Sequence, residues 1–322
     1  MTFGEFSLSG DAEAVQSALL FTYTGHEDRV YAVSWSPNSR FIASGSEQSV
    51  ITQQSQIQVW EAMTGQRTLT YTHHTKGVMS VAWSSDGQRI ASAGKDRTAQ
   101  VWDASTGYPL LLYTGHKDAL WAVAWAPSGD NIASASLDQS VQVWDSRTGQ
   151  LHYTYRGHAA AVTAVAWSPD GVYLASGGSD EGIQVWKVDT GRRLGIYGQV
   201  QGLTALAWSP NGRWIAANGP LSTVDVWDVQ TGQQLTSYMR HEGKVNTLAW
   251  SPDSNFIASA SEDTTVQIWR VVTGECLLTY TGHTDDVYTV SWSPDGKFLA
   301  SGGRDETVQI WSLRKLPVDG DV

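Results

Sequence analysis

The sequence predicts an all-β fold, because one pattern of short apolar runs separated by turn residues recurs seven times. In each copy a His, or once a Gln, is followed nine residues later by a Trp. Successive copies start 48, 42, 42, 41, 42 and 42 residues apart. Short β-type runs separated by turns are typical of antiparallel strands, and a fixed period in this range indicates a repeat architecture. The starting residues are His26, His74, His116, His158, Gln199, His241 and His283.

Residues 281–312 form the clearest copy. They contain an apolar run ending in Trp292, a Ser-Pro-Asp-Gly turn, a second apolar run, an Asp, and a third run ending in Trp311. A fourth run precedes the next Gly-His in most copies, as at 110–113. A four-stranded unit cannot bury both faces of its sheet alone, whereas units stacked radially around an axis bury both. The sequence therefore predicts a seven-bladed β-propeller of four-stranded antiparallel blades.

The two ends of the repeat array predict how the ring closes. No apolar run follows Trp311, so the last unit lacks its own fourth strand, while residues 17–23 resemble a fourth strand that belongs to no preceding unit. We therefore expect residues 17–23 to complete the last blade. The expected organisation is a flexible lead-in at 1–16, one propeller domain at 17–312 and a C-terminal tail at 313–322.

Composition narrows the classes of function and location. The net charge of −11 argues against binding to nucleic acid or to anionic membranes, which require a basic surface. The single Cys276 fits a reducing compartment, and neither a signal peptide nor an 18-residue apolar segment is present. We expect a cytoplasmic monomer. No phosphate-binding loop, zinc motif or Cys cluster occurs, so neither a cofactor nor a bound metal is expected.

Five units carry a His, a Ser, an Asp and a Trp at constant offsets. A Ser-His-Asp set suggests a nucleophilic catalyst. However, a catalytic site needs one strained arrangement that solvent reaches, whereas five equivalent copies indicate a scaffold, so we expect no enzymatic activity. The five sets are His74, Ser92, Asp96 and Trp102; His116, Ser134, Asp138 and Trp144; His158, Ser176, Asp180 and Trp186; His241, Ser259, Asp263 and Trp269; and His283, Ser301, Asp305 and Trp311.

The repeated dipeptides resemble the tryptophan–aspartate (WD) repeat family of β-propellers, over residues 17–312. They are Gly-His at 25–26, 115–116, 157–158 and 282–283, and Trp-Asp at 102–103, 144–145 and 227–228. The resemblance, which is to bacterial members in particular, implies a non-enzymatic scaffold or sensor for protein binding in signal transduction. It also implies that the His, Ser, Asp and Trp of each blade form a hydrogen-bonded chain.

Two units depart from this pattern. The fifth unit has Gln199, Ala217 and Leu221 in place of His, Ser and Asp, and the first unit has Gln54 in place of Asp. Loss of three members together is what a network predicts, because an orphaned buried polar group is costly. We expect these two blades to be the least protected against opening.

Variation between the repeats predicts the binding face. The loops that precede the first strand and follow the second strand of each unit share one face, here called the variable face, and their sequences differ most. At one position near the start of the first strand, the resemblance implies that the side chain faces the central opening. Four consecutive units have large groups there and three have small polar ones, as expected for an interface core beside its rim. These residues are Tyr288, Tyr31, Met79 and Trp121, followed by Thr163, Thr204 and Asn246.

We therefore expect a peptide or protein partner on the variable face. The sequence does not specify which partner this is. Charges of both signs around the aromatic group argue for a shaped protein surface rather than a phosphate backbone. The predicted contact residues are Arg29, Tyr31, Met79, Lys95, Trp121, Leu137, Asp286, Tyr288 and Arg304.

Three alternatives remain open at this stage. The large side chains can simply plug the channel mouth. The channel can bind a small molecule or metal ion, and the pair Asp285 and Asp286 is one candidate for a cation. The chain can also be a purely structural repeat module of a larger signalling protein. The long loop 47–56, with its apolar pair Val50 and Ile51, is expected to be exposed or to fold over the channel mouth.

Overall fold

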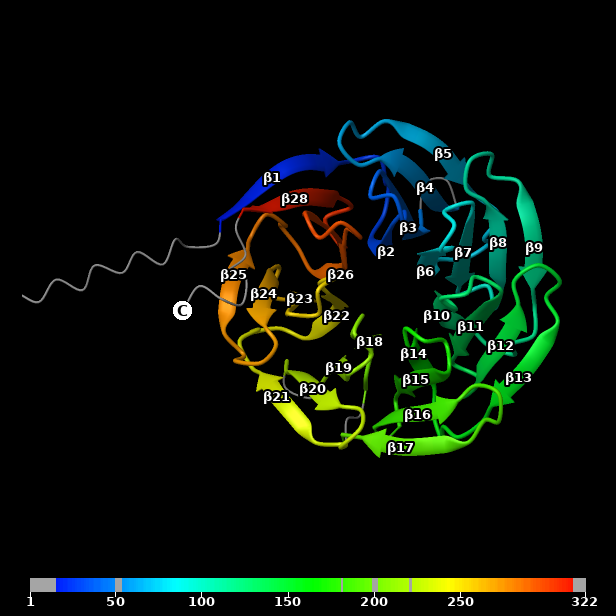
Figure 1. Ribbon diagram of the computed structural model, residues 1–322. Helices are drawn as coiled ribbons and strands as arrows, with labels where there is room; N and C mark the ends of the chain where they lie inside the picture. Colours follow the sequence, from blue (N-terminus) through cyan, green and yellow to red (C-terminus); the bar gives the residue numbers. More distant parts are fainter. Residues whose placement is uncertain (1–15, 50–53, 181, 199–201, 220–221, 315–322) are drawn as a thin grey trace, which may run out of the picture.

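The computed structural model describes residues 16–49, 54–180, 182–198, 202–219 and 222–314. Within these ranges the chain forms 28 β-strands in seven four-stranded antiparallel sheets. The sheets are arranged as blades around a central axis (Figure 1). The predicted fold, a seven-bladed β-propeller, is confirmed.

The blades follow the order of the repeats. Blade 1 contains β2 (Val30–Trp35), β3 (Phe41–Gln48), β4 (Ser55–Glu61) and β5 (Arg67–Tyr71). Blade 2 contains β6 (Val78–Trp83), β7 (Arg89–Gly94), β8 (Ala99–Asp103) and β9 (Pro109–Tyr113). Blade 3 contains β10 (Leu120–Trp125), β11 (Asn131–Ser136), β12 (Val141–Asp145) and β13 (Leu151–Tyr155). Blade 4 contains β14 (Val162–Trp167), β15 (Tyr173–Gly178), β16 (Ile183–Lys187) and β17 (Arg193–Tyr197).

The remaining blades complete the ring. Blade 5 contains β18 (Leu206–Trp208), β19 (Trp214–Asn218), β20 (Val224–Asp228) and β21 (Gln234–Tyr238). Blade 6 contains β22 (Val245–Trp250), β23 (Phe256–Ser261), β24 (Val266–Arg270) and β25 (Cys276–Tyr280). Blade 7 contains β26 (Val287–Trp292), β27 (Phe298–Gly303), β28 (Val308–Arg314) and the first strand of the chain, β1 (Gln16–Tyr23).

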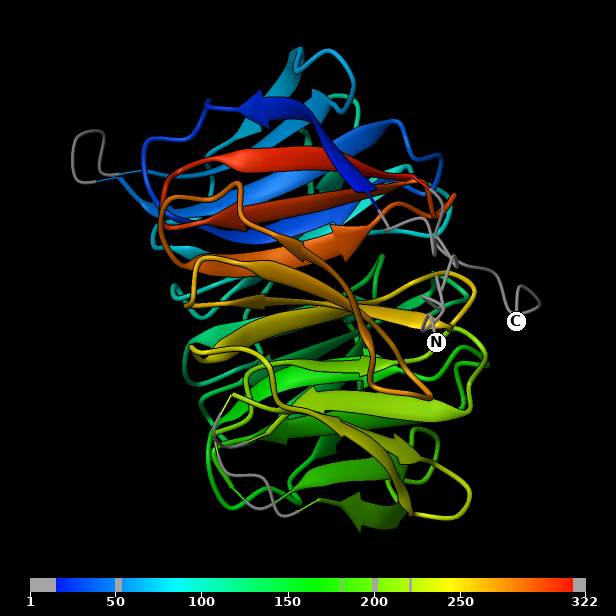
Figure 2. The same ribbon diagram turned by 90° about the vertical axis from the view of Figure 1, so that its left-hand side faces the viewer.

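Strand β1 closes the ring as predicted. It pairs antiparallel with β28, from Gln16 opposite Arg314 to Tyr23 opposite Val308. Figure 2 shows the two strands, dark blue and red, side by side at the edge of the ring. The pairing extends one residue before position 17 and two residues beyond position 312, the predicted limits of the domain. The last sheet therefore joins both ends of the propeller domain.

The hydrophobic core lies between neighbouring blades. In one cluster, Val141 and Val143 of blade 3 pack with Val162 and Leu174 of blade 4, and all four are at most 1% exposed. Each sheet thus buries both faces, one against each neighbour, which explains why the strands show continuous apolar runs rather than simple alternation. This arrangement leaves the two ends of the ring as its loop-bearing surfaces.

A β-bulge recurs in the first strand of six blades. In β2, Val30 pairs with Ser46 and Ala32 pairs with Gly45, so Tyr31 is the extra residue. The three-residue step from Val30 to Val33 does not fit the two-residue alternation of a strand and predicts a bulge or a bend near Tyr31. The structure has a bulge there. Equivalent register shifts occur at Met79, Trp121, Thr163, Asn246 and Tyr288. Bulges bend a strand and redirect a side chain, and here they occur at the position predicted to face the central opening.

Candidate functional site

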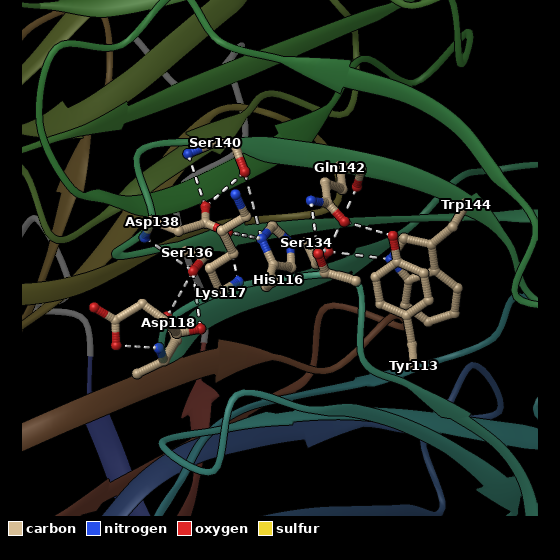
Figure 3. A network of polar contacts seen from close by, with 12 residues as sticks. Tyr113, His116, Lys117, Asp118, Ser134, Ser136, Asp138, Ser140, Gln142 and Trp144 are labelled. Carbon is tan, nitrogen blue, oxygen red and sulfur yellow. Dashed lines mark hydrogen bonds and ion pairs between the residues drawn. The ribbon is translucent and has the colours of Figure 1, made fainter.

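The repeated polar residues of blade 3 form one connected network (Figure 3). His116 precedes β10, and its Nε2 lies 2.8 Å from the Ser134 hydroxyl of β11 while its Nδ1 lies 3.0 Å from the carboxylate of Asp138. Trp144 of β12 donates from Nε1 to the same Ser134 hydroxyl at 3.1 Å. The network therefore ties the entry loop and the two middle strands of the blade together.

The same contacts recur in the other four complete sets. The His–Ser distance is 2.8 Å in each, and the shortest His–Asp distance in each set lies between 2.7 and 2.9 Å. Trp102, Trp186 and Trp311 donate to their Ser hydroxyls, whereas Trp269 does not. Trp269 is buried with no partner for its Nε1 among the described residues, which corrects the expectation for this one member.

Two further members of the network, a Tyr and a Gln, were missed by the sequence interpretation. In blade 3, Tyr113 donates from its hydroxyl to Oε1 of Gln142 at 2.5 Å, and its ring stacks on Trp144 with centroids 4.3 Å apart. Tyr113 belongs to β9 of blade 2, so these contacts join neighbouring blades. The available signal was a Gln two residues before six of the seven third-strand Trp residues, at 58, 100, 142, 184, 267 and 309.

Burial and hydrogen bonding together determine the ionisation of the network. Burial raises the pKa of Asp138, but hydrogen bonds from His116, Ser140 and the backbone N–H of Lys117 outweigh it and hold that pKa well below its usual range. Asp263 shows the same balance with His241 and Thr265. These two carboxylates therefore favour the ionised form and remain bound within their blades.

The two exceptional blades depart from this arrangement in different ways. In blade 1, His26 contacts the Ser44 hydroxyl, but its buried Nδ1 has no partner among the described residues, and Gln54 is exposed. Burial lowers the pKa of His26 to about 3, and the charge of Arg67 adds to this effect. In blade 5, Ala217 is fully buried in the place of the Ser. Gln199 and Leu221 lie outside the described residues.

The Ser, His and Asp sets do not form a reachable catalytic site in this structure. Ser92, Ser134, Ser176, Ser259 and Ser301 have no exposed surface, so no substrate carbonyl can approach their hydroxyls. A catalytic Ser needs its oxygen presented to a substrate pocket. The hydrogen-bonded sets thus connect strands within a rigid ring.

The first strands surround a cavity of about 340 Å³ at the axis of the ring. All seven residues at the position predicted to face the opening line it, and each is half-buried. The large side chains Tyr288, Tyr31, Met79 and Trp121 come from four consecutive blades, 7, 1, 2 and 3. We call these four residues the apolar arc. Thr163, Thr204 and Asn246 complete the circle.

Aromatic stacking organises part of the apolar arc. Tyr31 and Tyr288 stack with ring centroids 4.8 Å apart, and the ammonium group of Lys95 lies 5.5 Å from the centroid of Tyr31. Lys95 also contacts the carboxylate of Glu47 at 2.5 Å. Burial raises the pKa of Tyr288 to about 12, with contributions from Tyr31 and Asp286, so its hydroxyl stays protonated and can donate. It donates to Asp286 at 3.3 Å.

Two of the four predicted charged contacts, Asp286 and Arg304, are paired with each other. Arg304 lies 3.5 Å from the carboxylate of Asp286 and 3.7 Å from that of Asp285. The two carboxylates considered for a cation thus share an arginine. Leu137 is half-buried and Arg29 is exposed, and neither contributes to the cavity wall. Val50 and Ile51 of the long loop lie outside the described residues.

Lys244 is a cavity residue that the sequence interpretation did not select. It immediately precedes the first strand of blade 6, at the position that Arg29 occupies in blade 1 and Asp286 in blade 7. Blades 2 to 5 have only Gly or Ala at this position. A comparison of this column across the repeats, rather than of the bulge position alone, would have identified it.

Among the described residues, no three His, Cys, Asp or Glu side chains gather closely enough to hold a metal ion. Within the same ranges, the structure contains no helix with the length and apolar character that a membrane span requires.

The comparisons with known proteins agree with the geometry. The family model described as "WD domain, G-beta repeat" matches seven segments, at 17–60, 65–103, 107–145, 149–187, 191–228, 232–270 and 274–312. Each segment begins with the outer strand of one blade and continues into the next, so residues 17–23 count with the first repeat. No curated protein matches the sequence. The seven matched repeats cover most of the chain, which therefore belongs to the WD40 repeat family of β-propellers, a family that generally provides scaffolds for protein interaction.

Proposed function

We propose that this protein is a non-enzymatic scaffold that binds a peptide or a protein loop on its variable face, at the channel mouth. The observation that carries the proposal is the apolar arc: four large side chains from consecutive blades line one cavity and remain half-buried. A free protein gains little from holding Trp121 and Met79 partly in water. A bound segment that covered them would remove more of their apolar surface from water, and such aromatic anchors dominate many interfaces.

The rigidity of the ring supports this proposal. Tyr31 and Trp121 each occupy a bulge in a strand that is hydrogen-bonded within its sheet and packed against both neighbouring blades. Side chains held in this way lose little conformational entropy on binding, so more of the contact energy appears as affinity. The partner-contact set we propose comprises Arg29, Tyr31, Met79, Lys95, Trp121, Leu137, Asp286, Tyr288 and Arg304.

A small-molecule or metal ligand of the channel is the second candidate. The cavity wall offers Ala, Val, Thr and Ser side chains and one charged residue, Lys244, rather than converging carboxylates or imidazoles. A metal site needs several oxygen, nitrogen or sulfur ligands in one place. The wall therefore favours a peptide over a metal ion.

We include a cytoplasmic location, a monomeric state and a role in signal transduction in the proposal. The single Cys276 is compatible with a reducing compartment, and the net charge of −11 disfavours a nucleic-acid partner. Attachment to a larger signalling protein, as the resemblance to bacterial members implies, is part of the same proposal.

Affinity capture from a lysate of the source organism tests the binding face. The intact ring is compared with a variant in which Tyr31, Trp121 and Tyr288 are all changed to Ala. Tyr108→Ala is the matched control, because Tyr108 is a 68%-exposed aromatic in the β8–β9 turn on the opposite face. We expect one protein to be retained by the intact ring and by the control but lost by the triple variant, once circular dichroism shows all three folded. Equal capture by all three would remove the channel mouth as the binding face.

A further inference from the structure

The cavity at the channel mouth has two chemically different sides. The apolar arc occupies blades 7, 1, 2 and 3, and the opposite side is formed by Thr163, Thr204, Lys244 and Asn246 of blades 4, 5 and 6. Among the described residues that line the cavity, Lys244 is the only charged one. A segment that spans the mouth therefore meets apolar rings on one side and a single ammonium group with polar neighbours on the other.

Lys244 forms no ion pair with any of the described residues. In the described part of the chain, no carboxylate oxygen lies within ion-pair distance of its Nζ, although Lys95 and Arg304 on the same face both have carboxylate partners. Lys244 is exposed, and its backbone carbonyl is held by the N–H of Glu262 at 2.9 Å. The residue is thus fixed at its base, and its cationic end is available to a ligand.

The arrangement disfavours a cationic ligand. Aromatic rings can attract an ammonium group, but Lys95 already lies over Tyr31, so that ring face is occupied. Arg29 stands beside the same ring, and a hydrogen bond with Tyr31 raises the pKa of its guanidinium. A Lys or Arg of a partner would enter a region that already contains Lys95, Arg29 and Lys244, and like charges at an interface weaken binding.

We propose that the segment bound at the channel mouth pairs a large apolar side chain with a carboxylate, the apolar group lying on the apolar arc and the carboxylate facing Lys244. This inference rests on the proposed function and specifies the chemistry of its partner. The net charge of −11 repels a strongly acidic chain at long range, so the carboxylate belongs to an otherwise uncharged segment. An Asp or Glu side chain of the bound segment supplies this group.

A peptide array with matched charge pairs tests the inference. The probes are capped hexapeptides of Gly, Ser and Ala that contain one Trp, Phe or Leu and one Asp or Glu at each possible spacing. Each probe has a counterpart in which the acid is replaced by Asn or Gln. We expect the best acidic probes to bind about three- to tenfold more tightly than their amide counterparts, the range for a hydrogen-bonded ion pair that water still reaches.

Substitutions at Lys244 separate the charge effect from the apolar contact. Lys244→Ala should abolish the discrimination between acid and amide while the amide probes bind as before, and Lys244→Glu should reverse the preference. Lys297→Ala is the control, because Lys297 is an exposed lysine in a turn on the opposite face, and it should leave the discrimination unchanged. Trp121→Ala should weaken acid and amide probes alike.

The outcomes distinguish this inference from the proposed function. If no probe binds the intact ring better than it binds the triple variant of Tyr31, Trp121 and Tyr288, the peptide-binding function itself is wrong. If probes bind through the apolar arc but show no preference for a carboxylate, only the inference about Lys244 fails. The same holds if the preference persists in Lys244→Ala.

Discussion

Blade 3 and blade 5 have the same four-stranded topology but differ in what holds their strands together. In blade 3, His116, Ser134, Asp138 and Trp144 form a continuous set of buried hydrogen bonds. In blade 5, Ala217 removes the central hydroxyl, and the first strand shortens to Leu206–Trp208. Apolar packing against the neighbouring blades is therefore sufficient to form the sheet, and the polar network adds cohesion to a blade that already exists.

The contacts that blades 3 and 5 make with the preceding blade differ in the same way. Tyr113 of blade 2 stacks on Trp144 of blade 3 and donates to Gln142. At the entrance to blade 5, the corresponding Tyr197 of blade 4 instead donates to the backbone carbonyl of Val229 at 2.8 Å, because an Asp occupies the Gln position. The network thus joins neighbouring blades as well as strands, and blade 5 has lost part of both connections.

Removing one member of the blade 3 network should have the largest effect at neutral pH. Asp138→Ala leaves Nδ1 of the buried His116 without its carboxylate, and we expect a loss of about 3 kcal/mol in the free energy of unfolding, as for other broken buried pairs. Asp189→Ala is the control, because Asp189 is a mostly exposed aspartate paired with Lys187. Urea unfolding followed by near-ultraviolet circular dichroism measures the difference. A loss below about 1 kcal/mol would show that the blade does not depend on this contact.

A second prediction concerns pH and uses blade 1, where His26 lacks the carboxylate that His116 has. Burial lowers the pKa of His26 to about 3 in the folded ring, so the unfolded chain binds its proton first as the pH falls below 6.5. Stability should therefore decline by up to about 1.4 kcal/mol per pH unit between pH 6.5 and pH 3. Thermal unfolding across this range should show a shallower decline in His26→Gln than in the wild type. Identical slopes would mean that other groups cause the acid sensitivity.

The third prediction concerns amide hydrogen exchange, for which the expected difference in free energy between blades is smaller than in the two predictions above. We expect amides of β19 and β20 in blade 5 to exchange at least about fivefold faster than those of β11 and β12 in blade 3. This ratio corresponds to about the net free energy that one hydrogen bond contributes to stability. Blade 1 should also exchange faster than blade 3. Native-state exchange with peptide-level mass spectrometry measures both. Earlier opening of blade 2 or blade 3 would contradict the link between the network and local stability.

The sequence predicted the fold well, because the fold depends on residues repeated at a fixed period, whereas the channel-facing orientation of one column was implied by the resemblance to WD repeats. The closing strand and the bulge at Tyr31 follow from that period and from the two-residue alternation of strands. The sequence did not reveal that Lys95 pairs with Glu47, since this contact joins the end of β3 in blade 1 to the turn after β7 in blade 2, at positions that the repeat does not specify. Gln142 was overlooked because an alternating polar residue in a strand normally faces water, whereas here the neighbouring blade buries it.

The smallest expected effect concerns Asp225, which occupies the Gln position of blade 5 and is 8% exposed. Burial raises the pKa of its carboxyl, although hydrogen bonds from Ser237 and Thr223 oppose the shift. Because the pKa of Asp225 is higher in the folded ring than in the unfolded chain, its ionisation destabilises the ring as the pH rises from the unfolded-state pKa to the folded-state pKa. Asp225→Asn removes that cost and keeps the oxygen that accepts from Gln234, so it should raise the melting temperature slightly at pH 7 and have little effect below pH 4.

Asp228→Asn serves as the contrasting control, because turn hydrogen bonds from Thr231 lower the pKa of that carboxyl. If Asp225→Asn destabilises the ring at pH 7, the ionised carboxylate is itself a useful acceptor, and blade 5 contains a replacement network rather than a lost one.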